Sequence, residues 1–173
     1  MILDNIIMDF YMEKPLVLIV DDNKITLKLL RKHLEASGFK VQEAIDGIDC
    51  LEKVEAELPD AIVLDVMMPR MDGYETVKRL KDHSDTRNIP VIIVTALNDI
   101  ANQIKSIESG ADDFLSKPIE EKLLISKVKL LSNYAIQLRK SEILSDILHN
   151  IIDGKIDITN KSYDEIVNET WLN

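Results

Sequence analysis

The stretch IVLDVMMPRMDG, residues 62–73, decides the fold of this chain. A short apolar run ends on Asp65, and a loop with Pro69 and Gly73 follows. An apolar run this short, bounded by turn residues, is typical of a buried β-strand. Asp65 should therefore lie at the carboxyl end of a strand, which is where open α/β sheets bind their ligands. The rest of the chain can be read by asking what it places around Asp65.

Short apolar runs alternate with segments of helical spacing along the chain. A strand followed by a helix, five times over, predicts a parallel sheet with helices on both faces. The first, third and fourth strands are the most apolar and should be central, whereas the second and fifth should be edges. This gives the order 2-1-3-4-5, the flavodoxin-like doubly wound α/β fold. The predicted strands cover 16–20, around 41–43, 61–64, 90–94 and 114–116, and the helices cover 24–36, 48–58, 74–81, 98–108 and 120–151.

Charge and cysteine content narrow the class of protein. The 173 residues carry a formal net charge of −10, which argues against direct binding of nucleic acid because that requires a basic face. Cys50 is the single cysteine, so the chain forms no internal disulfide and lacks the ligands of a zinc site. The three histidines, His33, His83 and His149, have no metal-ligand spacing and are expected on helix surfaces.

The amino-terminal residues predict neither a membrane anchor nor a signal peptide. No apolar run approaches the ~20 residues of a membrane span. The start of the chain carries acidic residues instead of a basic segment, so we expect a cytoplasmic protein with no membrane association. Residues 1–14 are irregular in pattern and form an extension. Either translation naturally starts at Met12, or these residues form a short ordered arm.

Polar side chains stand at the carboxyl ends of four predicted strands. Asp21 and Asp22 follow the first strand, Asp65 ends the third, Thr95 follows the fourth and Lys117 follows the fifth. These four strands are consecutive in the predicted order, so the side chains should converge on one rim of the sheet. Chance could place one such group at a strand end, but chance is a poor explanation for four.

The chemistry of this cluster points to a phosphoryl group. Three neighbouring carboxylates repel one another unless a cation lies between them. Mg²⁺ prefers oxygen ligands and binds through one or two carboxylates together with phosphate oxygens. Lys117 adds a positive charge and Thr95 a hydroxyl. A carboxylate can act as a nucleophile that forms an aspartyl phosphate, so Asp65 is the candidate phosphoacceptor.

These motifs resemble the receiver domain of the response regulators of two-component signalling. The resemblance rests on Asp21-Asp22, Asp65 within LDVMMPRMDG, Thr95-Ala96 and Lys117-Pro118, and it covers residues 15–131. It implies a non-enzymatic, Mg²⁺-dependent domain that takes a phosphoryl group from a histidine kinase or phosphotransfer protein. Such a domain promotes only its own phosphorylation and dephosphorylation.

The resemblance also implies a set of metal ligands. Asp22 and Asp65 would bind Mg²⁺ directly, together with the backbone carbonyl of Met67, and Asp21 would act through water. Asp72, in the same loop, is expected to be solvated or to cap the next helix.

The remaining implied roles concern the response to phosphorylation. Lys117 would pair with the phosphoryl group or with Asp65, and Thr95 would swing toward a phosphoryl oxygen. Phe114 would turn inward with Thr95. Because Phe114 lacks a hydroxyl, its part would be a packing change, and a simple core position on an edge strand explains it equally well.

Residues 132–173 form a helical tail beyond the resembling region. Apolar residues step by four and three from 124 to 138, as in a heptad repeat. A helix over 120–151 would be about 48 Å long, so its distal half needs another partner than the sheet. We expect a homodimer through this helix, with a hairpin onto its own domain as the alternative. Gly154 ends the pattern, and a capping box at 162–165 predicts a last short helix.

Three other interpretations compete with that of a phosphorylation-switched receiver. The chain could be the receiver of a larger regulator, such as a cyclic-dinucleotide enzyme, whose effector domain is absent. A Mg²⁺-dependent phosphatase of the haloacid dehalogenase type would have an aspartate two residues after the nucleophile, where this chain has Met67. A phosphorylation-independent pseudo-receiver would lack Asp65, Lys117 or the acidic pair, and all are present.

Overall fold

The computed structural model describes residues 14–95, 104–105 and 107–153. By their contacts, these residues divide into a compact unit, Lys14–Ala135, and a second unit that contains the residues from Ile136 onward. Each unit is described by itself. The first contains the whole sheet and all the candidate site residues.

Five parallel strands form one sheet in the order β2-β1-β3-β4-β5. The strands are β1 (Leu16–Val20), β2 (Lys40–Ala44), β3 (Ala61–Asp65), β4 (Val91–Thr95) and β5 (Asp113–Ser116). Every residue of β1, β3 and β4 is buried, whereas β2 and β5 have partly exposed positions, as edge strands do. The predicted doubly wound fold and its strand order are confirmed.

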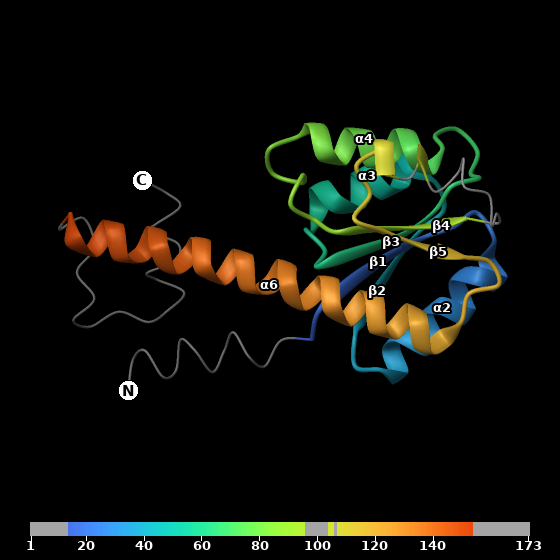
Figure 1. Cartoon of the computed structure of the whole chain (residues 1–173), viewed down its shortest axis with the longest axis horizontal. Helices are drawn as coiled ribbons and strands as arrows, with labels where there is room; N and C mark the ends of the chain where they lie inside the picture. The colour runs from blue at the N-terminus through green and yellow to red at the C-terminus, as the bar shows by residue number, and fades with distance from the viewer. Residues whose placement is uncertain (1–13, 96–103, 106, 154–173) are drawn as a thin grey trace. The chain divides into compact units, whose positions relative to one another are not determined.

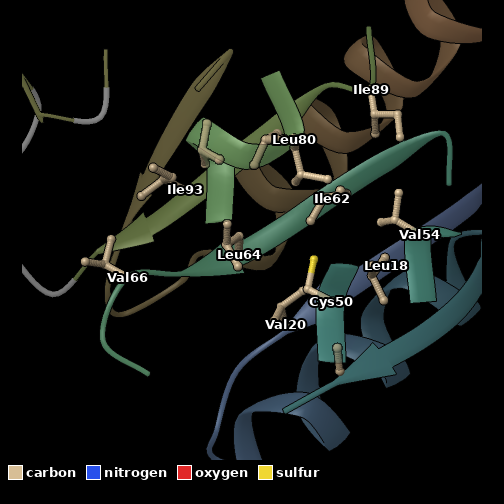
Figure 2. Close-up of a cluster of buried hydrophobic side chains, with 13 residues drawn as sticks. Leu18, Val20, Cys50, Val54, Ile62, Leu64, Val66, Leu80, Ile89 and Ile93 are labelled. Carbon is tan, nitrogen blue, oxygen red and sulfur yellow. The ribbon is translucent and has the colours of Figure 1, made fainter. Parts of the chain in front are cut away.

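Helices cover both faces of the sheet and enclose two apolar clusters (Figure 1). On one face, α3 (Gly47–Ala56) and α4 (Gly73–Asp82) pack against the strands. Figure 2 shows this cluster, in which Cys50 lies among strand side chains. On the other face, α2 (Lys24–Ala36) and the first turns of α6 (Glu121–Ile152) complete the second cluster.

The predicted helices match those of the structure to within two residues where they can be compared. The second predicted helix ends at Ala56 instead of Leu58, because Leu58 precedes Pro59 and a residue before proline disfavours the helical conformation. The fourth predicted helix, over 98–108, falls largely outside the described residues. The capping box at 162–165 and its short helix lie outside them entirely.

Helix α6 is the 32-residue helix expected after the sheet. Leu124 and Val128 are fully buried in the second cluster, and Leu131 packs against it, so the first part of the predicted apolar stripe belongs to the core of the first unit. In the second unit, Leu144 and Leu148 are exposed. No helix within the described part of the chain is both long and apolar enough to cross a membrane.

Candidate functional site

The topology brings the predicted site residues to one rim of the sheet. Asp65 is the last residue of β3 and Thr95 the last of β4, while Asp21 and Asp22 follow β1 and Lys117 follows β5. The strand register sets these ends side by side, since Val20 pairs with Leu64, Asp65 with Val94 and Thr95 with Ser116. The convergence expected from the strand ends is therefore present in the structure.

Lys117 connects two of the carboxylates. Its Nζ lies 3.0 Å from Asp65 Oδ1 and 3.3 Å from Asp21 Oδ2. Asp65 is 5% exposed and Asp21 2% exposed, so both carboxylates are buried, whereas the side chain of Lys117 is partly exposed. Asp21 also accepts a hydrogen bond from the backbone N–H of Asn23, at 2.8 Å, which fixes its carboxylate at the end of β1.

Burial and charge shift the ionisation of the central pair. Burial raises the pKa of the Asp65 carboxyl above its usual range, and the nearby charge of Asp21 adds to this, although the hydrogen bond from Lys117 opposes it. Burial alone would lower the pKa of Lys117, but Asp65 and Asp21 together raise it above its ordinary value. These neighbours therefore favour the charged form of Lys117, whereas Lys117 offsets only part of the cost of burying the charged form of Asp65.

The acidic residues fit a hard divalent cation. Asp21, Asp22 and Asp65 each offer a carboxylate oxygen, and these oxygens lie within 4.8 Å of one another. Asp22 is exposed, so the cluster opens to solvent on one side. An all-oxygen donor set that leaves room for water suits Mg²⁺. A cation there would also offset the repulsion that contributes to the raised pKa of Asp65.

Thr95 and Phe114 occupy different depths of this rim. Thr95 is 4% exposed, and its carbonyl accepts the backbone N–H of Lys117 at 2.8 Å, which ties β4 to the segment that carries the lysine. Phe114 pairs with Ile93, two positions before Thr95, and is half-buried on the edge strand. Phe114 thus lies two positions before the end of the edge strand, whereas Thr95 lies at the end of its own strand.

The loop after Asp65 is folded tightly against the end of β3. The N–H of Gly73 donates to the carbonyl of Val66 at 3.0 Å, and a Cβ at Gly73 would lie 2.9 Å from Val66 Cα. Only glycine permits this approach. Asp72 accepts the N–H of Glu75 and caps α4, which confirms the predicted capping role. Met67, the predicted carbonyl ligand, lies in this loop with its side chain 76% exposed.

A second buried carboxylate near this loop escaped the sequence interpretation. Asp46, which the sequence did not single out, is 1% exposed and binds the guanidinium of Arg70 through its Oδ2. Its Oδ1 caps α3 by accepting the N–H groups of Ile48 and Asp49. Asp49, three residues after Asp46, was the local signal for this cap. Nothing local indicated the pairing with Arg70, because 24 positions separate the two residues.

Comparisons with known proteins agree with this geometry. The family model of the response regulator receiver domain matches residues 17–129. The chain is 42% identical over 129 residues to the response regulator PleD of Caulobacter vibrioides, covering 73% of this chain and 28% of PleD. It is 36% identical over 115 residues to the response regulator MprA of Mycobacterium ulcerans, covering 66% of this chain and 49% of MprA. The chain thus spans about half or less of these relatives.

Solved structures give the same result. The receiver domain of the Francisella response regulator 1452 superposes with a TM-score of 0.66 at 36% identity, covering 70% of this chain and 98% of that one. The chemotaxis response regulator CheY4 of Vibrio cholerae superposes with a TM-score of 0.65 at 28% identity, covering 69% and 99%.

Proposed function

Because the chain belongs to the response regulator receiver domain family, we propose that Asp65 accepts a phosphoryl group and that this phosphorylation switches the domain. The observation that supports this most strongly is the placement of the Lys117 ammonium on Asp65 and Asp21, beside a third carboxylate, Asp22. This is the arrangement that phosphoryl transfer to a carboxylate requires, since catalysis of that reaction is mostly positioning and charge neutralisation.

In the proposed reaction, a carboxylate oxygen of Asp65 attacks the phosphorus of a phosphohistidine. An oxygen–phosphorus bond forms as the nitrogen–phosphorus bond breaks, and the histidine leaves with the electron pair. Asp22, Asp65 and the Met67 carbonyl would hold Mg²⁺, with Asp21 acting through water, and the bound cation would neutralise charge on the transferred group. Lys117 would form an ion pair with the new phosphoryl group, and the Thr95 hydroxyl would donate a hydrogen bond to one of its oxygens. Phe114 would turn inward together with Thr95.

The direct test is phosphorylation by a small donor. Acetyl phosphate with Mg²⁺ should add one phosphoryl group to the wild-type chain, measured by intact mass. Asp65→Asn should abolish the addition, and omission of Mg²⁺ should reduce it strongly. Asp60→Asn, outside the acidic cluster, is the matched control and should accept the group normally. Retention of the added mass in Asp65→Asn would refute the assignment.

A groove beside the site offers a surface for the phosphoryl donor. It measures about 280 Å³ and is lined by residues of α2 together with Lys117, Pro118 and the start of α6. Lys117 links this groove directly to Asp65. Ile25 and Leu29 of α2 line this groove and are 80% and 52% exposed. The proposed donor, a histidine kinase or phosphotransfer protein in the cytoplasm, would therefore present an apolar surface.

The proposed output is pairing of two copies through α6. Leu144 and Leu148 are exposed and lie one turn apart on this helix. Exposed leucines four residues apart suit the apolar seam of a left-handed coiled coil. Sedimentation of the full chain should show a dimer, and Leu144→Lys with Leu148→Lys should give a monomer. A wild-type monomer, phosphorylated or not, would exclude this output.

The domain limits and the effector also belong to this proposal. We assign residues 15–131 to the receiver, 1–14 to an extension and 132–173 to a linking or dimerising tail. The match to a minor part of PleD and to half of MprA favours a second version, in which this receiver controls an effector of a longer regulator. The phosphatase alternative is not favoured, because Met67 stands where a second catalytic aspartate would be needed.

A further inference from the structure

We propose that Arg70 and Asp46 form a positioning pair that holds the loop after Asp65 in its cation-binding conformation. The inference rests on the proposed function, because it concerns the Mg²⁺ site assigned above. Neither residue is among the proposed metal ligands. Their role would be to fix the backbone between Asp65 and α4, the segment that contains the Met67 carbonyl.

The Asp46 side of the pair is rigid. Asp46 Oδ1 accepts hydrogen bonds from Ile48 N at 2.9 Å and Asp49 N at 3.1 Å. The N–H of Cys50 donates to the Asp46 carbonyl at 2.9 Å, and Asp49 Oδ2 accepts the N–H of Ile45 at 3.0 Å. The carboxylate is thus built into the first turn of α3 and can serve as a fixed point for another segment.

The Arg70 side of the pair lies in the middle of the loop. Arg70 Nε donates to Asp46 Oδ2 at 2.6 Å, and Nη2 donates to the same oxygen. Arg70 has a φ of 63°, in the left-handed region that a residue with a Cβ adopts at a cost. An unfavourable backbone conformation persists only where its surroundings hold it in place. The two hydrogen bonds to Asp46 provide such a hold.

The first turn of α3 and the loop after Asp65 also pack closely against each other. A Cβ added to Gly47, the residue after Asp46, would lie 2.8 Å from Cγ and 2.9 Å from Cβ of Met71, the residue after Arg70. Met71 is itself 8% exposed. The α3 turn and the loop therefore contact each other through a charged pair and an apolar contact, three to four residues from Met67.

Removal of Arg70 should change the affinity for Mg²⁺ in opposite directions, depending on whether Arg70 acts through its charge or by positioning the loop. Arg70 is a positive charge near an acidic site, so its removal should strengthen Mg²⁺ binding if only long-range electrostatics matter. If Arg70 positions the loop, its removal should weaken binding despite the more favourable field. Loss of residues that orient metal ligands typically costs about 10- to 100-fold in metal affinity. We expect the low end, about 10-fold, because one ligand of the set is affected.

The experiment measures the dissociation constant for Mg²⁺ by calorimetric titration of the full chain. Arg70→Ala and Arg70→Gly should each weaken binding about 10-fold. The glycine variant relieves the left-handed strain, so it separates loss of the hydrogen bonds from backbone relaxation. Arg70→Lys, which keeps the charge but not the planar donor pair, should fall between these variants and the wild type. Arg79→Ala removes an equal charge from an exposed pair with Glu75 on α4 and should leave the constant unchanged.

A double-variant cycle tests whether Asp46 is the partner. Asp46→Asn keeps an oxygen for the α3 cap and should weaken Mg²⁺ binding as Arg70→Ala does, and combining the two should add little further loss. Unchanged or tighter binding in Arg70→Ala would overturn the proposal while leaving Asp65 phosphorylation intact. A wild-type chain that binds no Mg²⁺ would overturn both, whereas additive losses would overturn the pairing with Asp46.

Discussion

Two buried carboxylates, Asp65 and Asp46, serve the same loop and are treated in opposite ways. Asp46 is satisfied by two backbone N–H groups and a guanidinium, and these donors lower the pKa of its carboxyl although burial alone would raise it. Asp65 has one ammonium and a neighbouring carboxylate, and burial raises its pKa. The Asp46 carboxylate therefore stabilises the fold, whereas the Asp65 carboxylate has few hydrogen-bond donors and is suited to binding a cation. We propose that this difference separates a structural acid, Asp46, from the phosphoacceptor, Asp65.

Mg²⁺ should produce the largest effect on this difference. Binding to the folded chain alone stabilises it by about 2.7 kcal/mol at a concentration 100 times the dissociation constant. Urea unfolding of the wild type with MgCl₂ should show this gain, measured against NaCl of equal ionic strength. Asp65→Asn should lose most of the gain, whereas Asp72→Ala, outside the acidic cluster, should retain it. An equal gain in the wild type and in Asp65→Asn would break the distinction.

Replacing Asp46 should have the next largest effect on the stability of the fold. Asp46→Ala removes an N-cap worth about 1 kcal/mol and the charged pair with Arg70, so we expect a loss of about 2 kcal/mol in the free energy of unfolding. Asp72→Ala, which removes the exposed cap of α4, should cost about 1 kcal/mol. Equal losses in the two variants, measured by urea unfolding, would mean that the Arg70 pair contributes nothing.

In the absence of Mg²⁺, Asp65→Asn should have a smaller effect on the free energy of unfolding, and it should stabilise the chain instead of destabilising it. The folded state holds the Asp65 proton more tightly than the unfolded state, so its contribution favours folding at low pH and is lost as pH rises through the raised pKa. The variant should therefore be more stable than the wild type at pH 7, by up to about 1 kcal/mol, and the advantage should vanish below a pH of about 4.

Asp46→Asn should change stability in the opposite direction across the same pH range. In the wild type, the lowered pKa of Asp46 stabilises the fold above the ordinary carboxyl pKa, and this stabilisation is lost as pH falls through the lowered value. The variant should be destabilised at neutral pH and approach the wild type in acid. Urea unfolding at several pH values measures both curves, and curves of the same sign would contradict the contrast between the carboxylates.

The smallest expected effect concerns Cys50, which lies in the same helix that Asp46 caps. Burial raises the pKa of its thiol to about 12, and the side chain lies in the apolar cluster of Figure 2. The folded chain should therefore react with iodoacetamide far more slowly than the chain in urea. Comparable rates in the two states would show that α3 opens readily, which would contradict its firm capping by Asp46.

The sequence predicted the features that depend on local patterns, but it did not predict contacts between residues far apart in the chain. Apolar runs predicted β1, β3 and β4 because a strand buried on both faces is apolar at every position, and the polarity of β2 predicted an edge. The predicted strand order was then enough to place the acidic residues and Lys117 at the same rim of the sheet. Asp46 and Arg70 could not be paired in this way, because their contact joins two loops and leaves no periodic trace in either.

The central claim is that Asp65, and neither Asp46 nor the acidic pair, carries the phosphoryl group. Borohydride reduces an aspartyl phosphate to homoserine, which marks the site permanently for peptide mass spectrometry. After treatment with acetyl phosphate and Mg²⁺, the wild-type chain should yield homoserine at position 65 alone. Homoserine at position 21, 22 or 46, or a phosphoryl group that survives on a histidine, serine or threonine, would contradict the assignment.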